Sequence, residues 1–339
     1  MRIGINPTKL NNKIDISFNH RVIVPVYIPN LEGYFTDAIK ILDHCFSSIY
    51  HTVDERTAIT IIDNACCVEA KNYLEQQFSE GRIDQLIVNK MNLGKVDPLI
   101  SAIRGCHEEL ITITDADVLF KSGWLQAVQE VFANFPKAGL VSPSPGPLGF
   151  QNYSTSILWD TKLSSSLKFR PLLDRKDMEM FLHSIGKPNM YNENHYATQL
   201  SVQQNGVNAI VGCGHFVITC RRSVFDLSPK SPSKLLIEGF SESDYIDKPS
   251  DVGGYWKLAT VKNLAYHMGN TWEPWMDEYA PKTVSDRTAA SFVLPPVETS
   301  SKMLPYRVKN KAVVSMFKVK WLRKFFFKKW GATFPIDQY

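Results

Sequence analysis

Hydrophobic positions follow two alternating periods along the first third of the chain. Short runs rich in β-branched residues predict four strands, at 21–28, 58–62, 84–89 and 110–114, of which the first two are expected to be buried. Between these runs, apolar residues recur at steps of three and four and predict helices, at 34–50, 67–80 and 95–106. Strands that alternate with helices form parallel sheets covered on both faces. We therefore expect an α/β fold with a Rossmann-like, mostly parallel central sheet.

The pattern becomes less regular after a stretch rich in proline, glycine and serine, at 139–149. Such a composition favours turns, so we place a boundary near residue 145. Residues 150–205 are polar and show little periodicity, whereas 210–225 and 255–266 each predict a strand. The expected organisation is an N-terminal extension, two halves of one domain and a C-terminal extension, at 1–20, 21–145, 146–280 and 281–339.

Composition narrows the class of protein. Of 339 residues, 44% are hydrophobic and 21% are charged, which is typical of a globular chain with its own core. The six cysteines form no CxxC pair, so we expect free, mostly buried thiols in a reducing compartment. We find no apolar segment of signal-peptide length near the N-terminus and no apolar window of 18 residues. These observations predict a cytoplasmic protein.

The net charge of +4 is distributed unevenly. Residues 302–330 contain ten basic residues and no acidic one, which leaves 28 basic against 34 acidic residues elsewhere. A mildly acidic body argues against a nucleic-acid-binding protein, whose basic patch lies across the fold. Within 311–330 lysines mix with aromatic residues, which predicts a helix of one of two kinds. It either contacts an anionic membrane surface, such as the inner face of the plasma membrane, or packs on the body with its lysines in solvent.

Acidic residues follow two of the predicted strands directly. Asp63 ends the second strand and Asp115 ends the fourth, so both lie at the carboxyl edge of the sheet, where ligands bind. Asp115 and Asp117 are two residues apart after an apolar strand. Two carboxylates on one turn can approach a hard divalent cation such as Mg²⁺ or Mn²⁺, which can bridge a diphosphate. The sequence therefore predicts a metal and diphosphate site at this edge.

These segments resemble, in order, the nucleotide-diphospho-sugar glycosyltransferases of the GT-A fold, particularly the inverting family 2. The resemblance covers 21–269. Its pieces are Val24-Pro25-Val26-Tyr27, Ile61-Ile62-Asp63-Asn64, Asn92-Leu93-Gly94 with Ala102, and Asp115-Ala116-Asp117, followed by His267-Met268-Gly269-Asn270.

The resemblance implies a role for each matched residue. It implies that the first half binds the nucleotide sugar and that the second binds the acceptor. Asp115, Asp117 and His267 would be metal ligands. The general base would be Glu242 or Asp244, with Asp247 and Asp251 as weaker candidates. His215, after two glycines, would face an acceptor or diphosphate, or belong to a plain tight turn. The implied nucleotide-sugar contacts are Pro25, Val26, Tyr27, Asp63, Asn92, Gly94, Asp115 and Ala116.

The implied activity is an inverting, metal-dependent transfer of a hexose to an acceptor hydroxyl. A UDP-sugar is the preferred donor, and a glycan or a lipid-linked molecule is the expected acceptor, in the synthesis of cell-surface polysaccharide or lipopolysaccharide. Two alternatives belong to other classes. A nucleotidyltransferase on a similar sheet would carry a loop rich in glycine and arginine after its first strand, and residues 28–36 lack that arginine. A catalytically inert sugar-binding module would not need the intact pair Asp115 and Asp117.

Overall fold

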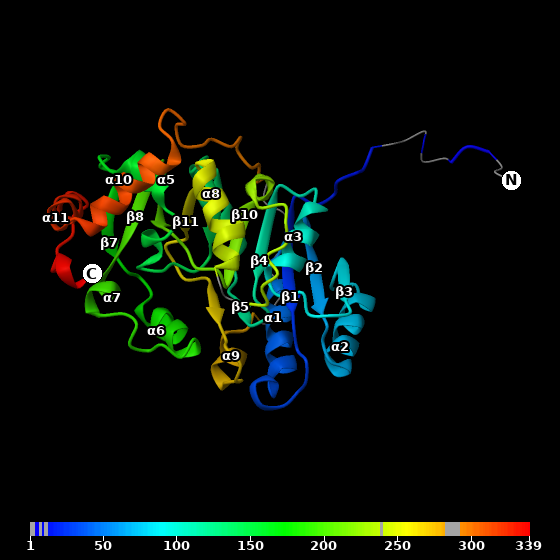
Figure 1. The fold of residues 1–339 in the computed structure, drawn as a ribbon. Coiled ribbons are helices and arrows are strands. Elements are labelled where there is room, and N and C mark those ends of the chain that lie inside the picture. Colours follow the sequence, from blue (N-terminus) through cyan, green and yellow to red (C-terminus); the bar gives the residue numbers. More distant parts are fainter. Residues whose placement is uncertain (1–3, 7–8, 10–12, 238–239, 282–291) are drawn as a thin grey trace.

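The computed structural model describes residues 4–6, 9, 13–237, 240–281 and 292–339 (Figure 1). In this part of the chain, ten strands form one continuous sheet in the order β3-β2-β1-β4-β10-β6-β11-β9-β8-β7, and β5 and β12 form a separate two-stranded ribbon. The strands of the sheet are β1 (His20–Val26), β2 (Thr57–Asn64), β3 (Gln85–Asn89), β4 (Leu110–Thr114), β6 (Ala138–Ser142), β7 (Leu167–Pro171), β8 (Thr198–Gln204), β9 (Val207–Val211), β10 (Val217–Arg221) and β11 (Trp256–Ala259). The ribbon consists of β5 (Val118–Phe120) and β12 (Ala265–His267).

The sheet is mixed, so the expectation of a mostly parallel sheet is wrong. Strands β3, β2, β1 and β4 are parallel neighbours, as their alternation with helices predicts. Beyond β4 the pairings are antiparallel, with one parallel exception, β6 with β11. Part of the physical reason lies in the connections: β8 and β9 are joined by Asn205 and Gly206 alone, and such a short link joins antiparallel strands.

Two hydrophobic cores lie on opposite faces of the sheet. In β1, Val22 and Val24 belong to one core and Ile23 to the other, because successive side chains in a strand point to opposite faces. Helices α1, α2 and α4 contribute to the first core, and α3 contributes to the second. The helices are α1 (Ala38–Thr52), α2 (Val68–Ser79), α3 (Val96–Arg104), α4 (Trp124–Asn134), α5 (Thr155–Thr161), α6 (Arg175–Ser184), α7 (Glu193–Ala197), α8 (Lys248–Gly253), α9 (Pro274–Tyr279), α10 (Tyr306–Lys318) and α11 (Lys320–Lys329).

The second half of the chain departs furthest from the periodicity. Residues 150–205, expected to be irregular, contain α5, β7, α6, α7 and β8. The predicted strands 210–225 and 255–266 are each divided by a loop, into β9 and β10 and into β11 and β12. Four of these elements have five to seven residues and span too few positions to show a period, whereas α6 has ten residues.

The C-terminal extension contains two helices, α10 and α11, where one was expected. They lie beside α5 and β7, at the end of the sheet opposite β3 (Figure 1). All six cysteines are free. No helix among the described residues is long and apolar enough to cross a membrane.

Candidate active site

A cleft of about 590 Å³ opens at the carboxyl ends of β1 and β4. The chain runs from β1 outward to β2 and β3 and then returns to β4 on the other side of β1. Such a reversal of strand order leaves a crevice outside the strand ends, where open α/β sheets bind their ligands. Most residues that the sequence analysis selected line this cleft: Pro25, Val26, Tyr27, Asn92, Gly94, Asp115, Ala116, Asp117 and His267.

The ribbon of β5 and β12 brings His267 to Asp117. Its register pairs His267 with Val118, and the backbone N–H of Met268 donates to the carbonyl oxygen of Asp117 over 2.7 Å. The two side chains therefore meet, with 3.4 Å between His267 Nε2 and Asp117 Oδ2. A contact across 150 positions of sequence is thus fixed by one short antiparallel pairing.

The surroundings of Asp117 in the cleft shift the pKa of its carboxyl group. Burial raises its pKa to about 6, the neighbouring Asp115 adds to the rise, and His267 opposes it. Its Oδ1 is buried and has no hydrogen-bond partner among the described residues. A buried polar oxygen without a partner costs free energy, so binding of a proton or a cation to this atom would be favourable.

The imidazole of His267 is held in place on both sides. Its Nδ1 lies 3.0 Å from the hydroxyl oxygen of Ser184 in α6. The rings of Phe181 and Phe216 meet it edge-on, with centroids 6.2 and 5.6 Å away. This arrangement directs Nε2 toward Asp117, and a partner on the second ring nitrogen is what metal-binding histidines usually have.

Lys95 lies between two carboxylates at the cleft. Its Nζ is 2.5 Å from Asp115 Oδ1 and 2.6 Å from Glu242 Oε1. Burial alone would lower the pKa of Lys95, but the two carboxylates outweigh it and the pKa is raised. Lys95 therefore stays charged and joins α3, β4 and the segment before α8 at one point. Lys95 was not among the predicted site residues, although it directly follows Gly94 of a matched motif.

A backbone segment, 233–237, closes the cleft over Gly94. The N–H of Lys95 donates to the carbonyl of Leu236 over 2.9 Å, and Asp97 accepts from the N–H groups of Ser233 and Lys234. Gly94 has a φ of +78°, and any Cβ there would collide with the carbonyl oxygen of Leu235. Glycine is required here by both the left-handed conformation and the close approach.

The resemblance implied that Asp63 contacts the nucleotide sugar, but of Asp63 and Asn64 it is Asn64 that lines the cleft. The Asp63 carboxylate accepts from the N–H of Cys66 over 2.8 Å and is almost fully buried in its own turn. Asn64 lines the cleft instead, and its amide donates to Asn92 and to the carbonyl of Gly94, both over 2.9 Å. Asn64, which the sequence analysis did not select, therefore holds the end of β2 against the loop before α3.

The four candidates for a general base lie in different environments. Glu242 does not itself line the cleft but pairs with Lys95, which does, whereas Asp244 is largely exposed and pairs with Lys248 over 3.3 Å. The buried Asp251 accepts from the first N–H groups of α5, those of Thr155 and Ser156. A carboxylate at a helix N-terminus satisfies donors that the helix itself leaves unpaired, which is a structural task.

Asp247 forms a second charged group behind the cleft. It lies in a turn of wide helix, η5 (Ser243–Asp247), and contacts His215 Nε2 and Lys257 Nζ, the latter over 3.2 Å. Burial would raise the pKa of Asp247, but Lys257 and His215 lower it below its ordinary value. The structure therefore engages His215 with Asp247, and neither lines the cleft.

Asp117 and His267 fit a divalent cation only in part. In the described ranges no group of three or more histidine, cysteine or acidic side chains is arranged to hold a metal. Asp115, the third predicted ligand, is engaged by Lys95. Mg²⁺ and Mn²⁺ sites that serve diphosphates, however, commonly use one or two protein ligands, with substrate oxygens and water completing the shell. The unpaired Oδ1 of Asp117 is the atom that suits such a cation.

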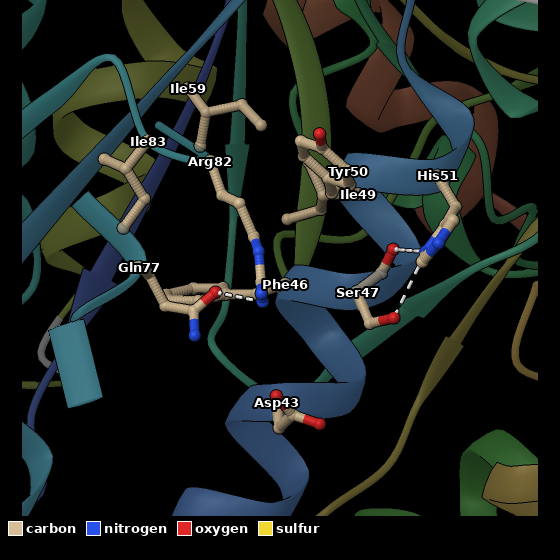
Figure 2. Close-up of a pocket in the computed structure, with 10 residues that line it drawn as sticks. All are labelled: Asp43, Phe46, Ser47, Ile49, Tyr50, His51, Ile59, Gln77, Arg82 and Ile83. Carbon is tan, nitrogen blue, oxygen red and sulfur yellow. Dashed lines mark hydrogen bonds between the residues drawn. The ribbon is translucent and has the colours of Figure 1, made fainter. Parts of the chain in front are cut away.

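A separate cavity of about 380 Å³ lies between α1 and the turn before β3 (Figure 2). Figure 2 shows Arg82 directed into it, where its guanidinium donates to Gln77 Oε1 over 2.9 Å. Arg82 also pairs with Glu80 over 2.5 Å. The wall of this second cavity contains none of the residues that line the cleft, so we do not place the site there.

Comparisons with known proteins give matches of structure alone. The sequence matches no protein-family model and no curated protein. The similar solved structures include the mannosyltransferase PcManGT from Pyrobaculum calidifontis in complex with GDP-Man and Mn²⁺, with 21% identity and a TM-score of 0.31 over 38% of this chain and 36% of that one. They also include S. aureus TarS 1-349, with 11% identity and a TM-score of 0.42 over 74% of this chain and 60% of that one, and the same fragment in complex with UDP, with 12% identity and a TM-score of 0.40. The matches thus include a glycosyltransferase, as the sequence motifs led us to expect. All three TM-scores are below 0.5, and this chain spans 36% to 60% of the length of these three chains.

Proposed function

We propose that this protein is a glycosyltransferase that moves a sugar from a nucleoside-diphosphate sugar, with UDP-sugars preferred, to an acceptor hydroxyl. The observation that carries the proposal is the unpaired, buried Oδ1 of Asp117 beside His267, at the strand ends where the order of the sheet reverses. A carboxylate with a raised pKa in a cleft is typical of functional sites. The carboxyl edge of the sheet is where a nucleotide binds in open α/β folds.

The nucleotide would lie along β1 and the loop before α3. Tyr27 and Phe35 offer rings beside the cleft, with centroids 6.3 Å apart, and Asn64 offers a polar group at the end of β2. The diphosphate would lie near Lys95, Asp117 and His267. Asp117 and His267 would hold Mn²⁺ or Mg²⁺, which when bound would offset the charge that builds on the departing diphosphate. Lys95 would add a fixed positive charge on the same side.

Glu242 is the general base in this proposal. Its Oε1 pairs with Lys95. Its Oε2 would take the proton of the acceptor hydroxyl as the hydroxyl oxygen attacks the anomeric carbon. A single displacement of this kind inverts the configuration at that carbon. Asp244 points to solvent with Lys248, and Asp247 and Asp251 are committed to buried partners, so they are weaker candidates. The acceptor would be a glycan or a lipid-linked molecule used in cell-surface polysaccharide synthesis.

Two halves of the domain follow from these roles. Residues 21–145 would bind the donor, and 146–280 would supply the base and the acceptor surface. The boundary falls just after β6, and both halves share the one ten-stranded sheet of the described residues. Donor binding and acceptor binding would thus belong to two parts of one folded unit, and α10 and α11 pack at its end.

The proposal is tested by measuring release of nucleoside diphosphate from a panel of UDP- and GDP-sugars, with Mn²⁺, with Mg²⁺ and with chelator. We expect turnover of one donor that requires the cation. Asp117→Asn should abolish turnover and also the rise in melting temperature that Mn²⁺ gives the native protein. Asp244→Asn, a carboxylate of the same type outside the cleft, is the matched control and should behave as wild type.

Three outcomes would contradict the proposal. Normal turnover by Asp117→Asn would remove the metal role. Transfer of a nucleotidyl group from a nucleoside triphosphate, in place of a sugar, would assign a nucleotidyltransferase. Tight binding of a nucleotide sugar with no turnover of any donor, alone or with simple sugar acceptors, would assign an inert binding module.

A further inference from the structure

The aromatic residues of the two C-terminal helices fall into an inward and an outward set. Phe327 and Trp330 are fully buried, and Trp330 closes onto the body through its carbonyl, which accepts from the N–H of Phe169, and its indole, which donates to the carbonyl of Lys162. Trp321 and Phe325 are 69% and 54% exposed. The inward set attaches the helices to the body, so the outward set is not needed for that attachment.

The outward aromatics stand among lysines on one face of α11. Trp321, Phe325 and Lys328 follow one another at steps of four and three, which places them on the same side of a helix. Lys324 and Lys329 flank this row and are exposed. We call Trp321, Lys324, Phe325, Lys328 and Lys329 the α11 outer face.

The positive charge of this face is compensated only in part by the carboxylate near it, Asp337. Asp337 is the nearby carboxylate, and it pairs with Arg323 over 2.8 Å and with Lys320 over 3.6 Å. Within the ranges that the structure describes, Lys324, Lys328 and Lys329 form no ion pair. The remainder of the protein, by contrast, carries an excess of acidic residues. A negative surface would therefore be attracted to this end of the molecule and repelled by the rest.

We propose that the α11 outer face docks the protein on an anionic lipid membrane. Lysines near such a surface are attracted to its headgroups, and exposed tryptophan and phenylalanine enter the interface between headgroups and acyl chains. Both kinds of side chain occur here on one face and within two helical turns. A nucleic acid would be matched less well, because its binding surfaces favour paired, forked arginines, and the one arginine of α11 is already engaged by Asp337.

The proposal does not depend on the activity proposed above, and it joins the two interpretations that the sequence left open. The inner side of the C-terminal helices is packed on the body, and the outer side remains for a membrane. Because the contact is made at one end of the sheet, beside the edge strand β7, the membrane would meet the protein in one orientation. It would approach the end opposite β3 (Figure 1).

Flotation with lipid vesicles tests the proposal on the full chain. Wild type should float with vesicles of phosphatidylcholine and phosphatidylglycerol, and not with phosphatidylcholine alone. The doubly substituted variant Lys324→Glu with Lys328→Glu should lose at least about 20-fold in partitioning, because each lysine contributes roughly fivefold near an anionic surface. Trp321→Ser with Phe325→Ser should lose binding at high salt, where the aromatic contribution is all that remains.

Matched controls separate this face from general stickiness. Lys187→Glu with Lys262→Glu makes the same charge change at exposed lysines elsewhere, and Phe78→Ser removes an exposed aromatic residue of α2. Both controls should float as wild type does. All variants change exposed side chains, and unaltered melting temperatures would show that they fold.

Several results would overturn the proposal. Equal flotation with neutral and anionic vesicles would remove the electrostatic component, and equal loss in the control variants would show that the face is not specific. Binding of polyuridylic acid that is lost in the lysine variant, without binding to vesicles, would assign the face to nucleic acid. A dimer that dissociates in the Trp321 and Phe325 variant, again without vesicle binding, would assign it to a second copy of this chain.

Discussion

Two groups of charged side chains in this protein have opposite ratios of basic to acidic residues. At the cleft, one lysine, Lys95, lies between the carboxylates of Asp115 and Glu242. Behind it, one carboxylate, Asp247, lies between Lys257 and His215. The side chains of Asp247 and Lys257 are 1% and 4% exposed, whereas His215 and the three side chains of the cleft group remain partly open to solvent.

The comparison separates a group that holds the fold from a group that can change partners. A buried ion is stable only while its partner remains, because nothing else in the interior can solvate it. Lys95 and its carboxylates can exchange one another for water, a cation or a phosphate. The cleft group also carries an excess of negative charge, since two carboxylates face one ammonium, which favours a cation nearby.

The largest effect should come from breaking the buried group. Asp247→Asn would leave Lys257 charged and unpaired in the core, and we expect a loss of about 3–5 kcal/mol in the free energy of unfolding. Urea denaturation at pH 7 measures it. A loss below about 1 kcal/mol would mean that water reaches Lys257, and the contrast between the two groups would then fail.

Glu242→Gln should have a large effect on activity and a small one on stability. Removing a general base lowers kcat by about 10²–10⁴-fold, while a partly exposed ion pair contributes about 1 kcal/mol or less to folding. Steady-state kinetics with the donor identified above, together with urea denaturation, separate the two quantities. If kcat is unchanged, the base is a different residue and Asp244 becomes the next candidate; Asp251 follows if Asp244→Asn also keeps wild-type kcat.

Asp117 should give the protein a pH-dependent stability of the opposite sign to that of most carboxylates. Its folded pKa of about 6 is above the ordinary value, so between about pH 4 and pH 6 the folded state binds more protons than the unfolded state. Stability should therefore fall by about 3 kcal/mol as pH rises through this range, before any cation is added. Asp117→Asn should flatten this slope and raise stability at pH 7. An unchanged slope in the variant would assign it to another group.

The smallest effect should come from Asp244→Asn. Asp244 and Lys248 form an exposed pair one helical turn apart, and such pairs contribute about 0.3–0.5 kcal/mol. We expect wild-type kcat and a shift in the free energy of unfolding at the limit of detection. A strong loss of activity would exchange the roles of Asp244 and Glu242.

The periodic part of the chain was predictable because three of its four strands, β1, β2 and β4, are mostly buried on both sides. Every residue of β2 is buried, and the apolar run that this requires is visible in the sequence. Asp115 and Asp117 could be placed at the carboxyl edge for the same reason, since they directly follow such a strand. The short antiparallel strands of the second half lack this signal, and the expected parallel sheet was wrong there.

The pairing of charges could not be predicted in the same way. The sequence does not show which acidic residue each lysine contacts. Lys95 is found beside Asp115 and Glu242, Lys248 beside Asp244, and Lys257 beside Asp247. Glu242, Asp244, Asp247 and Asp251 lie within ten residues, and the sequence did not decide between Glu242 and Asp244 as the base. The turn of wide helix at Ser243–Asp247 and the helix that follows it turn them in different directions.

The sequence by itself determined which strands are buried and which carboxylates end them, because hydrophobic period and strand length are local properties. Only the tertiary structure decided that His267 meets Asp117, that Lys95 separates Asp115 from Glu242, and that Trp330 turns inward while Trp321 turns outward. These contacts join positions up to 150 residues apart in the first two cases and opposite sides of one helix end in the third. They depend on strand register and on which face finds a partner, and neither is encoded in any short stretch of chain.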